Sequence, residues 1–107
     1  MTTLEQARRA AYDLSPTVRQ QAALHLGTHA DASVTPELVS LLVAEPDFFV
    51  RETLTWAVVR HPDAALPHLV AALGSAPDAR VQVLHALSKI GIEIRPDDLV
   101  PQRRRRR

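Results

Sequence analysis

The chain of 107 residues contains no cysteine, which excludes disulfide bonds, thiolate metal sites and a cysteine nucleophile. Aromatic residues make up only 4% of it, while Ala, Leu and Val dominate a hydrophobic content of 46%, and this balance favours helices. Three glycines cannot build a phosphate-cradling loop, and the glycine-rich nucleotide-binding motifs do not occur. No apolar run is long enough to cross a bilayer and no signal peptide is recognisable, so we expect a cytoplasmic protein without a membrane span.

The charge of the chain is divided between its body and its end. The whole sequence has a net charge of +1, yet its last five positions are all arginine. Without them, residues 1–102 hold 8 basic against 12 acidic residues, a net charge of −4. We therefore expect a single domain over 1–102 and a separate basic tail over 103–107, formed by Arg103, Arg104, Arg105, Arg106 and Arg107.

The sequence repeats itself with a period near 31 residues. The segment "VTPELVSLLVAEPD" at 34–47 returns as "ALPHLVAALGSAPD" at 65–78. Outside these segments, "VRQQAALHLGTHADA" at 18–32 aligns with "VRETLTWAVVRHPDA" at 50–64, and a shorter third copy, "RVQVLHALSKIG", covers 80–91. A period of this length predicts stacked supersecondary units, each too small to bury its apolar face alone.

Each repeat unit has the hydrophobic pattern of two helices. Val50, Leu54 and Val58 fall on one face at helical spacing, and Leu38 and Leu42 do so in the shorter partner helix. The corresponding stripe of the next short helix consists of Leu66, Leu69, Val70 and Leu73. The pattern predicts helices near 3–13, 16–29, 35–45, 48–61, 64–75 and 78–90.

Capping signals support these helix limits. Ser15 and Thr35 each precede a proline, which places a capping hydroxyl before a first-turn proline. Gly74 and Gly91 suit helix ends. At the N-terminus a stripe of apolar residues predicts that the first helix caps the array, and its members are Leu4, Ala7, Ala11 and Leu14.

These features together resemble short bacterial HEAT repeats. The resemblance covers about residues 15–100, and Arg19, Arg51 and Arg80 occupy the arginine position that recurs in that family. It implies an all-α fold, a right-handed α-α solenoid of about two and a half HEAT-like repeats with an N-terminal capping helix. The third repeat is cut short by Pro101, so its cover is thin, and a second copy of the chain is one candidate for completing it.

The sequence predicts two candidate partner-binding surfaces. Phe49, Trp56 and Val59 turn away from the core face of helix 48–61, and Arg60 can stack on Trp56. Aromatic residues beside arginine are typical interface anchors, although neighbouring repeats could instead cover this ridge. The resemblance implies that the shorter helices line a concave face that could seat a partner helix or remain solvated, and its outward residues include Glu37, Ser40, His68 and Ala71.

The chain offers no convincing catalytic, cofactor or metal site. His25 and His29 have the spacing of two metal ligands, but no third ligand lies near them in the sequence. HEAT-like metal-dependent hydroxylases rely on His-Glu pairs, which do not occur here. We therefore expect no enzyme and no cofactor.

The function predicted from the sequence is a non-catalytic protein-interaction module, such as an adaptor, a scaffold or a regulatory subunit. The alternative is a nucleic-acid-associated protein that uses the arginine tail, because five arginines can bind phosphates. An acidic protein or lipid surface, the acidic body itself, or no dedicated partner are the other interpretations of the tail.

Overall fold

The computed structural model describes residues 2–91 and consists there of six α-helices and one short 3₁₀ helix. Every expected helix is present, and no strand occurs among the described residues. The helices are α1 (Leu4–Ala10), α2 (Pro16–His29), α3 (Thr35–Ala44), α4 (Phe48–Val59), α5 (Pro62–Ala72) and α6 (Pro77–Ile90), with the 3₁₀ helix η1 (Ala32–Val34) before α3.

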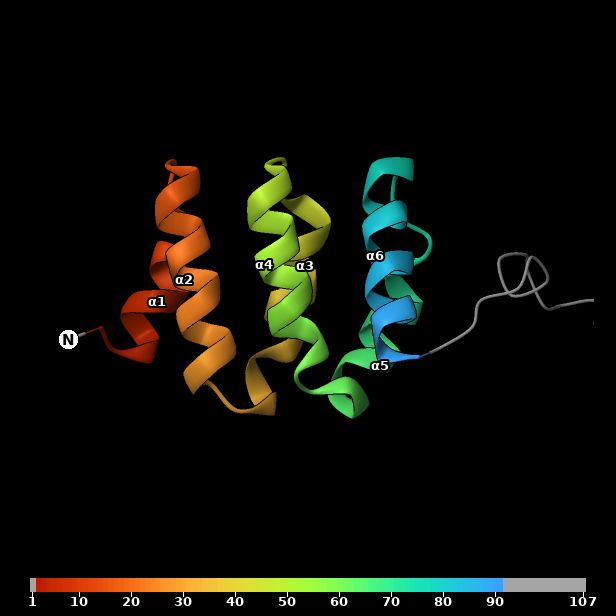
Figure 1. The fold of residues 1–107 in the computed structure, drawn as a ribbon, viewed down its shortest axis with the longest axis horizontal. Coiled ribbons are helices and arrows are strands. Elements are labelled where there is room, and N and C mark those ends of the chain that lie inside the picture. The colour runs from red at the N-terminus through yellow and green to blue at the C-terminus, as the bar shows by residue number, and fades with distance from the viewer. Residues whose placement is uncertain (1, 92–107) are drawn as a thin grey trace, which may run out of the picture.

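The helices form two layers (Figure 1). Helices α2, α4 and α6 stand side by side, and α2 packs on α4 as α4 packs on α6. Helices α1, α3 and α5 lie behind them, where α3 contacts both α4 and α5. This stacking of successive helix pairs confirms the expected all-α solenoid.

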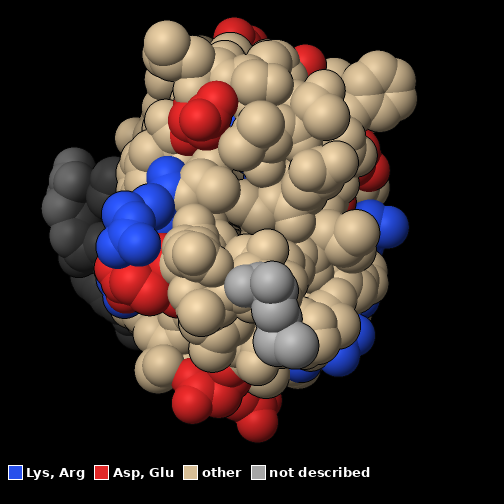
Figure 2. Space-filling model, turned by 90° about the vertical axis from the view of Figure 1, so that its left-hand side faces the viewer, with Lys and Arg blue, Asp and Glu red and all other residues tan. Residues whose placement is uncertain are grey.

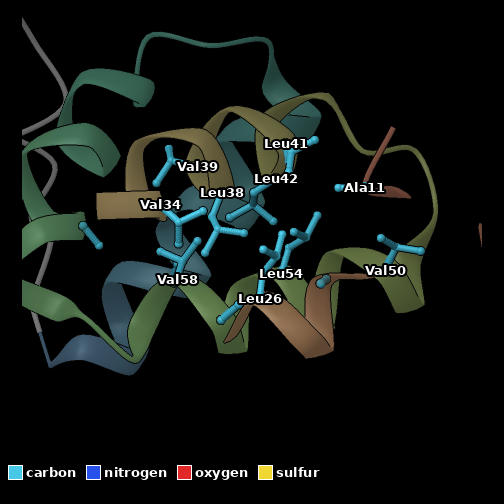
Figure 3. Close-up of a cluster of buried hydrophobic side chains, with 14 of the residues drawn as sticks. Ala11, Leu26, Val34, Leu38, Val39, Leu41, Leu42, Val50, Leu54 and Val58 are labelled. Carbon is cyan, nitrogen blue, oxygen red and sulfur yellow. The ribbon is translucent and has the colours of Figure 1, made fainter. Parts of the chain in front are cut away.

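The core lies between the two layers (Figure 3). Leu38 and Leu42 of α3 point toward Leu54 and Val58 of α4, and Leu26 of α2 joins them. All five are buried, as the helical spacing predicts for the four residues of α3 and α4. The interdigitated leucines and valines therefore join neighbouring repeats into one continuous core.

The apolar stripe of α5 differs from the prediction at one position. Leu69 is buried, but Val70 is half exposed. The helix starts at Pro62 rather than at residue 64, and its core line runs through Ala65 and Leu69. Successive helix residues are rotated by about 100°. A core stripe centred on Ala65 and Leu69 therefore places Val70 at the border of the buried face, where it is partly exposed.

Capping by Ser15 is confirmed, but capping by Thr35 was a wrong prediction. The Ser15 hydroxyl accepts the Val18 backbone N–H at 3.4 Å. Thr35 instead has helical backbone angles and its hydroxyl is buried without a hydrogen-bond partner. The 3₁₀ turn runs directly into α3, so Val34 is the residue at the capping position. The Thr35 hydroxyl is therefore buried in the core.

Helix α1 is shorter than the sequence predicts, which leaves part of its apolar stripe outside the core. Ala7 and Ala11 are buried as expected, but Leu4 and Leu14 are exposed. The helix ends at Ala10, so Leu14 lies in the turn before α2. At the other end, Gly91 closes α6 with a positive φ of 96°, as predicted for a helix-ending glycine. The expected C-terminal cover and the arginine tail at 103–107 lie outside the described residues.

Candidate functional site

Four large hydrophobic side chains are exposed along one edge of the molecule, where α2 and α4 begin. Tyr12 and Leu14 lie in the turn before α2, and Phe48 and Phe49 are the first two residues of α4. Their exposed fractions are 62%, 95%, 55% and 67% in that order. The two phenylalanine rings contact each other edge to face, with centroids 5.4 Å apart. We call these four residues the loop edge; α2 and α4 begin at the top of Figure 1.

The surface beside Tyr12 and Leu14 is hollowed into a groove of about 320 Å³, which we call the loop groove. One wall is the turn that joins α1 to α2. The other wall is the C-terminal half of α3 with the turn that follows it. Most of the exposed lining is apolar, and the lining residues are Ala11, Tyr12, Asp13, Leu14, Arg19, Ser40, Leu41, Ala44, Glu45 and Pro46.

A two-pronged ion pair holds the two walls of the loop groove together. Arg19 donates from Nε and Nη2 to the two carboxylate oxygens of Glu45, each at 2.9 Å. Its Nη1 also donates to the backbone carbonyls of Asp13 at 2.9 Å and Leu14 at 3.0 Å. The side chains of Arg19 and Glu45 are only 14% and 5% exposed. The hydrogen bond to Glu45 raises the pKa of Arg19 above its already high ordinary value, and these charge-assisted hydrogen bonds fix the wall geometry.

The recurring arginine has the same backbone role in the next repeat, but no carboxylate within residues 2–91 pairs with it. Arg51 donates from Nη1 to the carbonyls of Glu45 at 3.1 Å and Pro46 at 2.9 Å. The residue that corresponds to Glu45 in the second copy of the repeat is Ala76. The Arg19–Glu45 pair therefore belongs to this groove and not to the repeat pattern as a whole.

Tyr12 is tied to α3 through Glu37. The Tyr12 hydroxyl donates to Glu37 Oε2 at 3.0 Å, and Arg8 Nε donates to Glu37 Oε1 at 2.8 Å. Partial burial, and then the hydrogen bond to Glu37, raise the pKa of Tyr12 above its ordinary value, while Arg8 acts in the opposite direction. This network anchors the short α1 and orients one side of the loop groove.

We expect the Glu37→Gln variant to lower the pKa of Tyr12, because it removes the negative charge beside the phenol. Tyr12 is the only tyrosine, so the ultraviolet absorbance of tyrosinate reports on this site alone. A tyrosine whose pKa is higher in the folded state than in the unfolded state stabilises the fold. This stabilisation is complete below the unfolded-state pKa of about 10, and it is lost as pH rises through the folded-state pKa. The fall in stability at alkaline pH should therefore be smaller in the variant. Identical titrations of Glu37→Gln and the control Glu52→Gln would contradict this assignment.

The predicted ridge on α4 is divided between exposed and packed positions. Phe49 is exposed, whereas Trp56 and Val59 are half-buried and pack against the core. The Trp56 ring fits against Gly27 of α2, where a side chain would collide with it. The predicted stacking is confirmed, since the Arg60 guanidinium lies 5.1 Å from the centre of the Trp56 ring. The four residues therefore do not form one exposed surface.

The residues predicted on the shorter helices are also separated. Ser40 lines the loop groove, while Glu37 is engaged by Arg8 and Tyr12. His68 and Ala71 are exposed on α5 and do not line that groove. Only Ser40 of these four positions thus contributes to the groove wall.

The described residues contain no group of three or more His, Asp or Glu side chains that could hold a metal ion. The rings of His25 and His29 lie 4.5 Å apart, but no third ligand of this kind joins them. Within residues 2–91, none of the helices combines the length and the apolar character that spanning a membrane requires.

Sequence reasoning missed three members of the loop edge, namely Tyr12, Leu14 and Phe48. One signal was available for Leu14. Because Ser15 caps α2, Leu14 occupies the position before the cap. An apolar residue there usually packs against an apolar residue at the fourth position of the helix, but in this chain that position is Arg19. A leucine without that partner is expected to remain exposed.

A family model described as HEAT repeats matches residues 2–88. Comparison with curated proteins and with solved structures finds no match. The matched span includes all six helices of the two-layer array except the last residues of α6. The repeat period, the stacked helix pairs and this match lead to one conclusion: the chain belongs to the HEAT-repeat family.

Proposed function

We propose that this protein is a non-catalytic protein-binding module, acting as an adaptor, scaffold or regulatory subunit, and that the loop edge with its groove is the binding surface. HEAT repeats are generally protein-interaction modules and are typically not enzymes. The observation that carries the choice of surface is the exposure of Tyr12, Leu14, Phe48 and Phe49 beside an apolar groove. Exposed apolar patches of this kind mark interaction sites on proteins that otherwise bury such residues.

The charges around the loop groove favour a protein partner over nucleic acid. Arg19 is neutralised by Glu45, and its remaining contacts are backbone carbonyls. Arg51, in the first turn of α4, also donates to backbone carbonyls. Farther from the groove, Arg8 and Arg9 are paired with acidic side chains, and Arg60 at the other end of α4 lies over Trp56. Binding of a phosphate backbone requires several cations that are available to it. An apolar groove with internally paired charges suits an aliphatic or aromatic side chain of another protein.

The test is a capture experiment in which the full-length protein is compared with single-site variants. We expect wild type to retain a defined protein after nuclease treatment, and Leu14→Asp to lose it. The substitution removes the most exposed apolar side chain of the loop edge without touching the core. Leu24→Asp is the matched control, because Leu24 is 53% exposed on α2, away from the loop edge.

Two outcomes would contradict the proposed surface. In the first, Leu14→Asp and Phe49→Asp still retain the same protein, whereas Arg60→Glu loses it. That result would place the binding site on the Trp56 side of α4. Recovery that disappears with nuclease, or on deletion of residues 103–107, would favour the nucleic-acid alternative based on the arginine tail. Circular dichroism of each variant checks that its helices are intact.

A further inference from the structure

We propose that the loop edge binds a second copy of this chain and makes the protein a two-fold symmetric dimer. This inference rests on the proposed function, because it names the protein that the same surface recognises. A two-fold dimer requires a surface that is complementary to itself, so that a projection and a matching hollow lie on one face.

The loop edge has both parts of such a surface. Leu14 projects with nearly all of its surface exposed, and it stands at the rim of the loop groove. The opposite wall offers the small side chains of Ser40 and Ala44 above the apolar Leu41. When a partner is related by a two-fold axis beside the rim, Leu14 of each copy can enter the groove of the other. The same pair of contacts then forms twice.

The exposed aromatic side chains of the loop edge supply about half of the surface that a stable dimer buries on each partner. An aromatic side chain carries roughly 150–250 Å² of surface, so the exposed parts of Tyr12, Phe48 and Phe49 together present roughly 300–450 Å². Leu14 and the groove walls add to this. A standard interface buries about 800 Å² on each partner, so one symmetric contact through this edge can reach the required size with its polar surroundings.

The charges at the loop edge permit two identical surfaces to approach. Arg19 and Glu45 cancel within the groove, and the Asp47 carboxylate accepts the Val50 backbone N–H. Seen from the α1 end, the upper part of the molecule is largely uncharged with scattered Asp and Glu, while Lys and Arg lie lower on either side (Figure 2). Arg51, in the first turn of α4, donates to the backbone carbonyls of Glu45 and Pro46, so a dimer through this edge buries no cation without hydrogen-bond partners.

The first test is the oligomeric state in solution, measured by sedimentation velocity and light scattering on the full-length chain from low to high micromolar concentration. We expect wild type to approach twice the monomer mass as concentration rises. Leu14→Asp and Phe49→Asp should remain monomeric, and the control Leu24→Asp should behave as wild type. Phe49→Asp is expected to fold because an acidic residue in the first turn of α4 favours the helix dipole.

The second test fixes the arrangement of the two copies. Because the chain has no cysteine, single cysteines introduced as Leu14→Cys and Ser40→Cys are unique reactive groups. We expect a short bis-maleimide linker to join a Leu14→Cys copy to a Ser40→Cys copy when the two are mixed. A Leu24→Cys copy mixed with Ser40→Cys is the control and should not be joined.

The outcomes separate this inference from the proposed function. A wild-type protein that stays monomeric at high micromolar concentration overturns the dimer, as does a dimer that persists in both Leu14→Asp and Phe49→Asp. If the protein is monomeric but Leu14→Asp still loses a captured protein, the proposed function stands and the second copy is the wrong partner. If the dimer forms through Leu14 and no other protein is captured, the loop edge serves self-association alone.

Discussion

Replacement of Gly27 by alanine is expected to destabilise the protein by about 2 kcal/mol, although alanine is the better helix former. An added Cβ would lie 2.9 Å from both Ala57 Cβ and Trp56 Cε3, and closer still to Trp56 Cζ3. Such overlap in a packed site costs about 1–3 kcal/mol or more, against a gain of about 1 kcal/mol from helix propensity. The Trp56 ring is rigid and half-buried between α2 and α4, so it cannot turn away without losing its own contacts.

Urea denaturation of Gly27→Ala measures this loss, and a thermal melt should show a fall of roughly 10 °C for a domain of this size. The control is Gly74→Ala, where nothing lies within 4 Å of the added Cβ. In a Trp56→Ala background the cost of Gly27→Ala should shrink by at least about 1 kcal/mol, the coupling expected of residues in contact. Equal costs in the two backgrounds would show that overlap with Trp56 is not the cause of the destabilisation.

The fold could be predicted from the sequence because its information is local and repeated. The period near 31 residues and the helical spacing of Leu38, Leu42, Leu54 and Val58 define the layers, and the structure buries all four. What failed were the details at helix ends. Thr35 has the sequence of a cap, but whether it caps depends on the preceding turn, and that turn is a 3₁₀ helix. This turn is held by only two backbone hydrogen bonds, from Val34 to Asp31 and from Thr35 to Ala32, and such short turns leave little trace in composition.

The candidate site was less predictable because it depends on contacts between repeats. A helical wheel places Trp56 away from the core of its own helix, but it cannot show that Gly27 of α2 leaves room for the ring. Leu14 continues an apolar stripe in the sequence, and the end of α1 at Ala10 shows that the stripe is broken there. The two walls of the groove are joined by Arg19 and Glu45, which lie 26 residues apart in the chain, and no local pattern signals a pair at that separation.

Loss of that pair should have the other large effect, and Arg19→Ala is expected to destabilise the fold by about 3 kcal/mol. The substitution leaves the Glu45 carboxylate almost fully buried, with the Asp47 backbone N–H as its remaining donor, and it releases two carbonyls of the turn before α2. Removing one partner of a buried pair costs more than the pair itself contributes, since an uncompensated charge remains. The expected loss of stability lies at the low end of the range for buried ion pairs, because the Arg19 guanidinium keeps some contact with water.

Urea denaturation at neutral pH of Arg19→Ala and Arg8→Ala compares two arginine–glutamate pairs of nearly equal length. Arg8 Nε lies 2.8 Å from Glu37, but this pair is solvent-exposed, so its loss should change stability little. Adding Glu45→Gln to Arg19→Ala removes the buried charge and should restore part of the stability, whereas Arg19→Lys should fall between wild type and Arg19→Ala because it keeps the charge but loses the fork. If Arg19→Ala is no less stable than Arg8→Ala, burial does not determine the strength of these two pairs.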